Sequence, residues 1–303
     1  MNRRALLGAV AALSVPLLGA SLTTTAWAAP RVKPPAKPSY VALGDSYAAG
    51  VGAGSYLSDG TTCRRSLKGY PGLIASAGGY ALNFQACSGA TVADVGGKQL
   101  GALGATTSMV TITVGGNDIG FADTLSTCLG TNTNACLAAI NEADGEIDSV
   151  LPDRLSALFG QVRTRVGAGT KVVVTAYPRL FNGRDCSLLT SFTADEMTRL
   201  NLGADHLAAT IKVAATAAGF AYADVPPAFL GHAVCDGSPW IRNAQLSNSF
   251  ESFHANASGY LYGYRPVVAG ALNATATPGA TMTVTTGGKT SSDTNRGTVK
   301  VRG

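Results

Sequence analysis

The chain has 303 residues, of which 46% are hydrophobic and 14% are charged, with a formal net charge of +5. This apolar content is enough for one complete core or two small ones, and it excludes a wholly disordered chain. Beyond the N-terminal region no stretch has the roughly 20 consecutive apolar residues of a spanning helix, which excludes a multi-pass membrane protein. Basic residues form no long runs and few aromatic residues lie among them, so we expect no nucleic-acid binding.

The first 28 residues have the pattern of an export signal. A pair of arginines precedes an apolar stretch at 5–22, and Ala26 and Ala28 place small residues at the two positions that signal peptidase inspects. We therefore predict cleavage after Ala28 and secretion of the chain. The alternative is a retained membrane anchor, which Pro16 disfavours because proline breaks a spanning helix.

Two further segments are predicted to lie outside the folded domain. Residues 29–38 form a proline-rich lead-in that cannot build a core element. Residues 273–303 are rich in Thr, Gly and Ser, which predicts a flexible tail with one strand-like patch at 282–285. The domain itself is expected to cover residues 39–272.

The six cysteines lack the C-x-x-C spacing of zinc ribbons and thioredoxin-like sites. An even number of cysteines in an exported chain indicates disulfides. The sequence leaves the pairing open, and the simplest pairing is sequential because each bond then closes a modest loop. The expected bonds are Cys63–Cys87, Cys128–Cys136 and Cys186–Cys235.

Five short apolar runs alternate with helical patterns along the chain. The runs lie at 40–43, 80–86, 109–114, 171–176 and 220–225. The helical patterns lie at 147–166 with a break or start at Pro152, at 193–218 with a cap at Thr193, and at 256–272 with an interruption at Pro266. Continuous apolar strands between helices predict an α/β fold with a parallel sheet covered on both faces. Ligands in such sheets bind at the carboxyl ends of the strands.

Polar and glycine-rich motifs follow three of the predicted strands. The motif GDS ends at Ser46, the motif CSG ends at Gly89, and the motif GGND contains Asn117. Ser46 has the place of a nucleophile at the rim of the sheet, although a serine there could equally cap the next helix. Asn117 can donate its amide hydrogen to a developing oxyanion, or adopt a left-handed turn. The neighbouring Asp45 and Asp118 are expected to cap helices or stabilise turns.

Together with His254, just before the last helical pattern, these motifs resemble the SGNH (GDSL) hydrolases, especially the secreted actinomycete lipases and phospholipases. The four blocks occur in the family order, and the resemblance covers residues 39–272. It implies a three-layer α/β/α sandwich of the flavodoxin-like type, with a central parallel sheet, and it implies ester hydrolysis. By this resemblance Ser46 is the nucleophile and His254 the general base, while Ser46, Gly89 and Asn117 form the oxyanion hole.

One position departs from the family pattern. The family usually has an aspartate three residues before the histidine, and this chain has Glu251 there. A carboxylate would hold the imidazole of His254 in the correct tautomer, but glutamate is one methylene longer. Because some relatives use a backbone carbonyl instead, the sequence leaves open whether Glu251 is the third catalytic residue.

The neighbourhood of His254 gives two further expectations. A histidine base has a reference pKa of about 6.5, so we expect activity to fall below about pH 6. Trp240, Phe250, Phe253 and Tyr260 could line an acyl pocket or belong to the ordinary core.

The leading hypothesis is a secreted, monomeric serine hydrolase that cleaves fatty-acyl esters as a lipase. A phospholipase A1, a short-chain or carbohydrate acetyl esterase, a thioesterase and a peptidase are alternatives with the same chemistry, and a secreted binding protein is the non-enzyme alternative. The small positive charge only weakly favours transient contact with an anionic lipid surface. Gly50, Gly52 and Gly54 lack the third glycine of a dinucleotide fingerprint, and the acidic residues lack ligand spacing, so we expect no cofactor and no metal.

Overall fold

The computed structural model describes residues 36–272 and the backbone of two strands at 282–286 and 298–301. The expected signal segment and most of the proline-rich lead-in lie outside these described residues. Within them, no helix is both long enough and apolar enough to cross a membrane.

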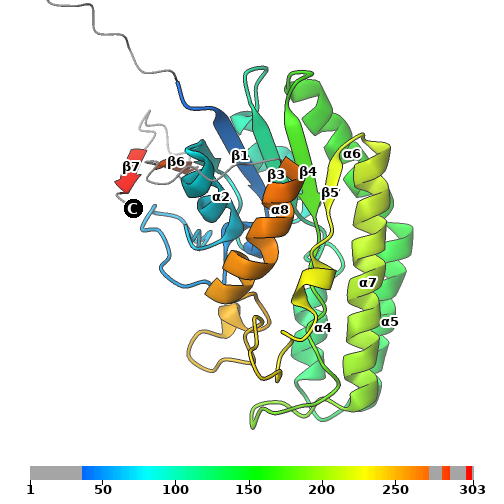
Figure 1. Ribbon diagram of the computed structural model, residues 1–303. Coiled ribbons are helices and arrows are strands. Elements are labelled where there is room, and N and C mark those ends of the chain that lie inside the picture. Colours follow the sequence, from blue (N-terminus) through cyan, green and yellow to red (C-terminus); the bar gives the residue numbers. More distant parts are fainter. Residues whose placement is uncertain (1–35, 273–281, 287–297, 302–303) are drawn as a thin grey trace, which may run out of the picture. The chain divides into compact units, whose positions relative to one another are not determined.

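A parallel sheet with strand order β5-β4-β3-β1-β2 forms the centre of the fold (Figure 1). Its strands coincide with the five predicted apolar runs. They are β1 (Ser39–Gly44), β2 (Ala81–Phe84), β3 (Met109–Thr113), β4 (Lys171–Thr175) and β5 (Ala221–Ala223). The central strands β1 and β3 are buried almost throughout, because helices cover both faces of the sheet, and this explains their continuous apolar sequence.

The chain reverses its direction of travel across the sheet between β2 and β3. β1 pairs with β2 on one side and with β3 on the other, where Gly44 lies opposite Thr113. In such sheets the crevice at the carboxyl ends of the strands beside this reversal is where ligands bind. The motifs that contain Ser46 and Asn117 follow β1 and β3, so the topology alone brings them to one crevice.

Helices cover the sheet on both faces and give the α/β sandwich that was predicted. On one face α2 packs against α8, and on the other α5, α6 and α7 pack together (Figure 1). Their bounds are α2 (Tyr70–Gly78), α5 (Thr133–Ser149), α6 (Leu151–Arg165), α7 (Ala194–Ala217) and α8 (Arg265–Leu272). Shorter helices lie near the strand ends: α1 (Ser46–Ala49), α3 (Val92–Asp94), η1 (Val95–Gln99), η2 (Leu100–Ala102), α4 (Phe121–Cys128), η3 (Pro226–Phe229), η4 (Ser249–Glu251) and η5 (Gly259–Tyr264).

The predicted helix boundaries agree with local sequence chemistry. Pro152 is the second residue of α6, where a missing backbone N–H costs nothing, and it separates α6 from α5. Thr193 and Glu196 form a reciprocal capping box at the start of α7. The last helical pattern divides into η5 and α8, and Pro266 follows the first residue of α8.

Two segments of the C-terminal tail belong to the sheet. β6 (Met282–Thr286) pairs in parallel with β2 and contains the predicted strand-like patch. β7 (Thr298–Val301) pairs antiparallel with β6 and was not expected from the composition of the tail. The rest of the tail lies outside the described residues.

The structure has the sequential disulfide pairing, with Cys63–Cys87, Cys128–Cys136 and Cys186–Cys235 bonded. Each bond fixes a loop or helix end close to the carboxyl edge of the sheet.

Gly44, the last residue of β1, fits its position only because it has no side chain. Its φ is +124°, and a Cβ atom there would lie 2.1 Å from the backbone oxygen of Thr113. The side chain of Gln99 holds both polar groups of Gly44: Oε1 accepts from its N–H at 2.7 Å, and Nε2 donates to its carbonyl at 2.9 Å. The end of β1, and so the start of the Ser46 motif, is fixed by this close approach.

We predict that Gly44→Ala loses about 3 kcal/mol or more of unfolding free energy, because it combines a backbone clash with a strained φ. Urea denaturation followed by circular dichroism measures this loss. Gly97→Ala is the matched control, since Gly97 is exposed in η1 and a Cβ there would meet nothing within 4 Å. Equal midpoints for the two variants would contradict the proposed constraint.

Candidate active site

Ser46 and His254 meet at the carboxyl end of β1. His254 Nε2 lies 2.8 Å from Ser46 Oγ, although the two residues are 208 positions apart in sequence. Ser46 is the first residue of α1, which follows β1 directly, and His254 lies in the loop before η5. The structure therefore brings the predicted nucleophile and the predicted base into direct hydrogen-bond contact.

Asp45 shapes the turn that presents Ser46. It is buried, and its Oδ1 accepts from the backbone N–H of Tyr47 at 3.0 Å, which makes it the N-cap of α1 as predicted. Burial raises the pKa of Asp45 to about 7, while hydrogen bonds from Tyr177 and from backbone N–H groups work against this shift. The cap therefore lies in an apolar setting rather than in solvent.

Tyr177 links the three strand ends around the site. Its hydroxyl donates to Asp45 Oδ2 and accepts from the backbone N–H of Gly116 at 3.0 Å. Because Tyr177 follows β4, one buried hydroxyl connects the residues after β1, β3 and β4. The sequence analysis missed this residue, although its place directly after a predicted strand was a signal that could have found it.

Close packing holds His254 against the Ser46 segment. The hydroxyl of Tyr47 donates to the carbonyl of Phe253 at 2.6 Å. Gly52 has a φ of +90°, and a Cβ there would lie 2.4 Å from the carbonyl oxygen of Ala255 and 2.9 Å from Cβ of His254. The loop after α1 and the loop that carries His254 thus touch backbone to backbone.

The carbonyl of Ser252, not the carboxylate of Glu251, supports the imidazole. His254 Nδ1 lies 3.0 Å from the backbone oxygen of Ser252, which requires Nδ1 to carry the proton and leaves Nε2 as an acceptor for the Ser46 hydroxyl. Glu251 instead accepts from the hydroxyl of Tyr56 and pairs with Arg242, whose Nε lies 3.3 Å away. The sequence left two arrangements open, and the hydrogen bond observed at Nδ1 of His254 is the main-chain one.

The environment of His254 opposes its protonation. Burial is the largest effect and lowers the pKa of His254 to about 4. The bond to Ser252 and the charge of Glu251 raise the pKa, and the charge of Arg64 lowers it further. Because burial keeps the imidazole neutral below its reference pKa, we now expect activity to persist below pH 6, where the reference pKa had led us to expect a fall.

Asn117 and Gly89 lie on adjacent loops. Asn117 lines the same pocket as Ser46 and His254, and its Nδ2 donates to the carbonyl of Ala90 at 3.0 Å, which leaves its second amide hydrogen free to donate. Gly89 is exposed with a φ of +82° and is not one of the residues that line the pocket. Asp118 caps α3 by accepting from the backbone N–H of Val92 at 2.9 Å, as expected of it.

A pocket of about 360 Å³ opens beside the Ser46–His254 pair. Of the four aromatic residues for which the sequence left a pocket or a core position open, Phe250 and Phe253 line the pocket, and Trp240 and Tyr260 do not. Trp240 stacks on the ring of His232, while Tyr260 is fully buried. Other apolar side chains of the pocket come from α4 and from two loops: Phe121, Ala122, Leu125, Leu129, Leu189 and Leu246.

Comparison with known proteins places this fold and site in one family. The model of the GDSL-like Lipase/Acylhydrolase family matches residues 42–261. Lipase 1 of Streptomyces coelicolor is 41% identical over 273 residues, covering 89% of this chain and all of that protein. The Streptomyces rimosus lipase is 41% identical over 270 residues, covering 88% of this chain and 98% of the lipase.

Solved structures agree with the sequence comparison. The phospholipase A1 of Streptomyces albidoflavus NA297 superposes with a TM-score of 0.74 at 42% identity, covering 78% of this chain and 99% of that one. The extracellular lipase of Streptomyces rimosus gives a TM-score of 0.73 at 42% identity, covering 77% of this chain and 99% of that one.

The fold and these matches define a carboxylic ester hydrolase. The chain belongs to the GDSL-like Lipase/Acylhydrolase family, as its motifs indicated.

We predict that kcat/KM stays level from pH 8 down to about pH 5 and falls to half near pH 4. Activity should persist to low pH because the pKa of His254 is lowered and a general base is active while it is unprotonated. Initial rates with a soluble ester, and circular dichroism at each pH to verify folding, provide the measurement. A fall centred near pH 6.5 in folded protein would show that the imidazole is not shielded as described.

We predict that Glu251→Gln retains kcat within about fivefold of wild type at pH 8, because the carbonyl of Ser252 already orients His254. The acid limb of the pH profile should move lower, since the charge of Glu251 raises the pKa of His254. The loss of kcat in His254→Ala is the reference value for removal of the base. A loss in folded Glu251→Gln comparable to that of His254→Ala would restore Glu251 as a catalytic residue.

Proposed function

We propose that this chain is a secreted lipid acyl-ester hydrolase that works through an acyl-enzyme at Ser46. The observation that carries the proposal is the 2.8 Å contact between Ser46 Oγ and His254 Nε2 at the mouth of a largely apolar pocket. A hydroxyl needs such a neighbouring base to become a nucleophile at neutral pH.

In the first half-reaction Ser46 Oγ attacks the ester carbonyl while its proton passes to Nε2 of His254. The carbonyl oxygen becomes negative, and the backbone N–H groups of Ser46 and Gly89 and the amide of Asn117 are the proposed donors to it. When the tetrahedral intermediate collapses, the carbon–oxygen bond to the alcohol breaks, and His254 returns the proton to the leaving alcohol. The acyl group stays on Ser46.

In the second half-reaction water replaces the serine as nucleophile. His254 takes a proton from the water, the hydroxide adds to the acyl carbon, and collapse releases the carboxylic acid and restores the Ser46 hydroxyl. The Ser252 carbonyl fixes the tautomer throughout, because it accepts the Nδ1 hydrogen in the neutral and protonated states.

The apolar pocket favours a fatty-acyl chain over a short acyl group. Leu125, Leu129, Leu189 and Leu246 surround space that an acetyl group would leave largely empty. The similar proteins are named lipases and a phospholipase A1, which favours acylglycerols or phospholipids over carbohydrate acetates.

Export is part of the proposal. The N-terminal pattern up to Ala28, the three disulfides and the extracellular lipase among the similar structures all support secretion. The proposed enzyme acts as a monomer, because both catalytic side chains and the proposed oxyanion donors come from one chain.

The test is a hydrolysis profile with p-nitrophenyl esters of increasing chain length, a diacylglycerol and a phospholipid. We expect measurable turnover that is greater for medium and long chains than for acetate. Ser46→Ala should abolish it, and Asn117→Ala should lower kcat by roughly 100- to 1,000-fold. A clear preference for acetate would favour the short-chain esterase, and full activity in Ser46→Ala would reject the acyl-enzyme.

A further inference from the structure

The loops next to Phe250 and His254 carry an excess positive charge. Three arginines and two carboxylates belong to these loops, and none of the five is a lining residue of the pocket. Arg65 pairs with Asp59 at 2.7 Å, and Arg242 pairs with Glu251 at 3.3 Å. None of the carboxylates in the described part of the chain pairs with Arg64, so the uncompensated charge of this cluster lies on that residue.

Arg64 stacks on an aromatic ring that lines the pocket, although Arg64 is not itself a lining residue. Its guanidinium carbon lies 3.9 Å from the centre of the Phe250 ring, and Phe250 lines the pocket together with Ser46 and His254. A guanidinium stacked on a ring keeps its N–H edge available for a ligand. The positive charge of Arg64 also lowers the pKa of His254.

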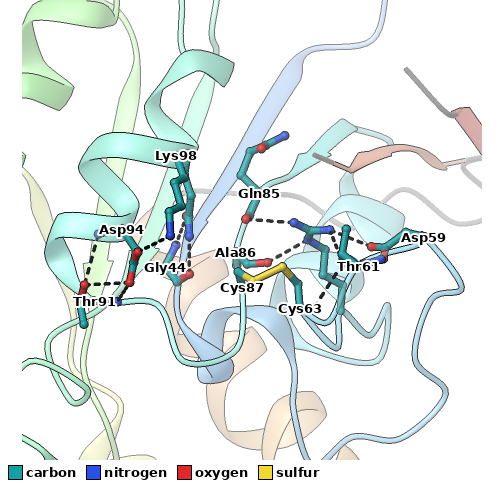
Figure 2. The surroundings of a disulfide bond; sticks show 12 residues. Gly44, Asp59, Thr61, Cys63, Gln85, Ala86, Cys87, Thr91, Asp94 and Lys98 are labelled. Atoms are coloured by element: carbon teal, nitrogen blue, oxygen red, sulfur yellow. Dashed lines mark hydrogen bonds and ion pairs between the residues drawn. A yellow bond between two sulfur atoms is a disulfide. The ribbon is translucent and has the colours of Figure 1, made fainter. Parts of the chain in front are cut away.

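The loop that presents Arg64 is held rigidly on both sides. Cys63 before it is bonded to Cys87 (Figure 2). Arg65 after it is buried and donates to the carbonyls of Ala86 and Gln85. Arg64 itself is exposed and has a φ of +54°, a left-handed conformation that is costly for a residue with a side chain. Such a conformation persists only where the surroundings impose it, and here it holds the Arg64 side chain over the ring of Phe250, which lines the pocket.

We propose that Arg64 is an anion subsite that binds the phosphate of a phosphoacylglycerol while the ester carbonyl of the same molecule lies at Ser46. This inference rests on the proposed function and adds the substrate class that the site selects. The acyl chain would occupy the apolar pocket around Leu125, and the short glycerol unit would bring the phosphate toward Arg64 beside Phe250. A guanidinium matches the geometry of phosphate oxygens with two parallel N–H groups.

The test compares two soluble substrates with the same acyl chains: dihexanoyl phosphatidylcholine below its micellar concentration, and dihexanoylglycerol. We expect Arg64→Gln to lower kcat/KM for the phospholipid about tenfold more than for the neutral diacylglycerol. Arg64→Lys, which keeps the charge but not the paired N–H groups, should show a smaller difference. Measurements at pH 8 keep His254 neutral in every variant.

Arg165→Gln is the matched control, because Arg165 is exposed in the last turn of α6, at the edge of the sheet opposite to the site. It removes the same charge and should leave both substrates unaffected. Equal losses for the two substrates in Arg64→Gln would overturn the subsite. Inhibition by inorganic phosphate is measured as well. If phosphate inhibits wild type but not Arg64→Gln, while the ratio of kcat/KM for the two substrates is the same in both proteins, Arg64 binds free phosphate and the proposed headgroup role is wrong.

The same assay separates the inference from the proposed function. If wild type hydrolyses neither substrate, or if Ser46→Ala hydrolyses both, the proposed function is rejected and the subsite with it. If wild type hydrolyses both in a Ser46-dependent way and Arg64→Gln does not change their ratio, only the subsite is rejected.

Discussion

The site depends on a hydrogen bond between the Ser46 hydroxyl and the His254 imidazole, which come from opposite ends of the domain sequence. The segment that leads into Ser46 is fixed because Gly44 packs against the backbone of β3 and forms two hydrogen bonds with the side chain of Gln99. The loop that carries His254 is fixed by the close approach of Gly52 to the backbone carbonyl of Ala255 and to Cβ of His254. A side chain at either glycine would move one partner away from the other, so two small residues set the geometry of the Ser46–His254 pair.

Buried tyrosine hydroxyls join the segments that these glycines bring together. Tyr47 donates to Phe253, Tyr260 donates to Val51, and Tyr177 donates to Asp45. Burial raises the pKa of each phenol above its ordinary value, so each remains a neutral donor at any working pH. These three phenols therefore keep their protons when His254 gains or loses one, as the fixed donors of a preorganised site must.

The sequence predicted the parts of the fold and site that depend on local pattern. Apolar runs identified the five parallel strands, and the strand ends identified Ser46 and Asn117, because side chains after parallel strands meet at one edge. The four family blocks identified His254, which no periodicity would have found among three histidines. At the edge of the sheet, β6 contains the predicted strand-like patch, but the composition of the tail gave no indication of β7.

What the sequence did not predict depends on contacts between distant segments. Gln99 contacts Gly44, and the leucines come together around the pocket, only because loops that are distant in sequence pack together in three dimensions. The support of His254 by Ser252 rather than Glu251 depends on the turn at η4, which directs the carboxylate to Tyr56 and Arg242. A main-chain carbonyl leaves no signature in a sequence, so this choice was open until the backbone was seen.

Covalent labelling by a fluorophosphonate, with the modified residue mapped by peptide mass spectrometry, tests the central claim most directly. If Ser46 is activated by His254, folded wild-type protein is labelled at Ser46 to one equivalent, and His254→Ala is labelled far more slowly. Folded wild-type protein that resists the reagent, or that is labelled at another serine, would contradict the account.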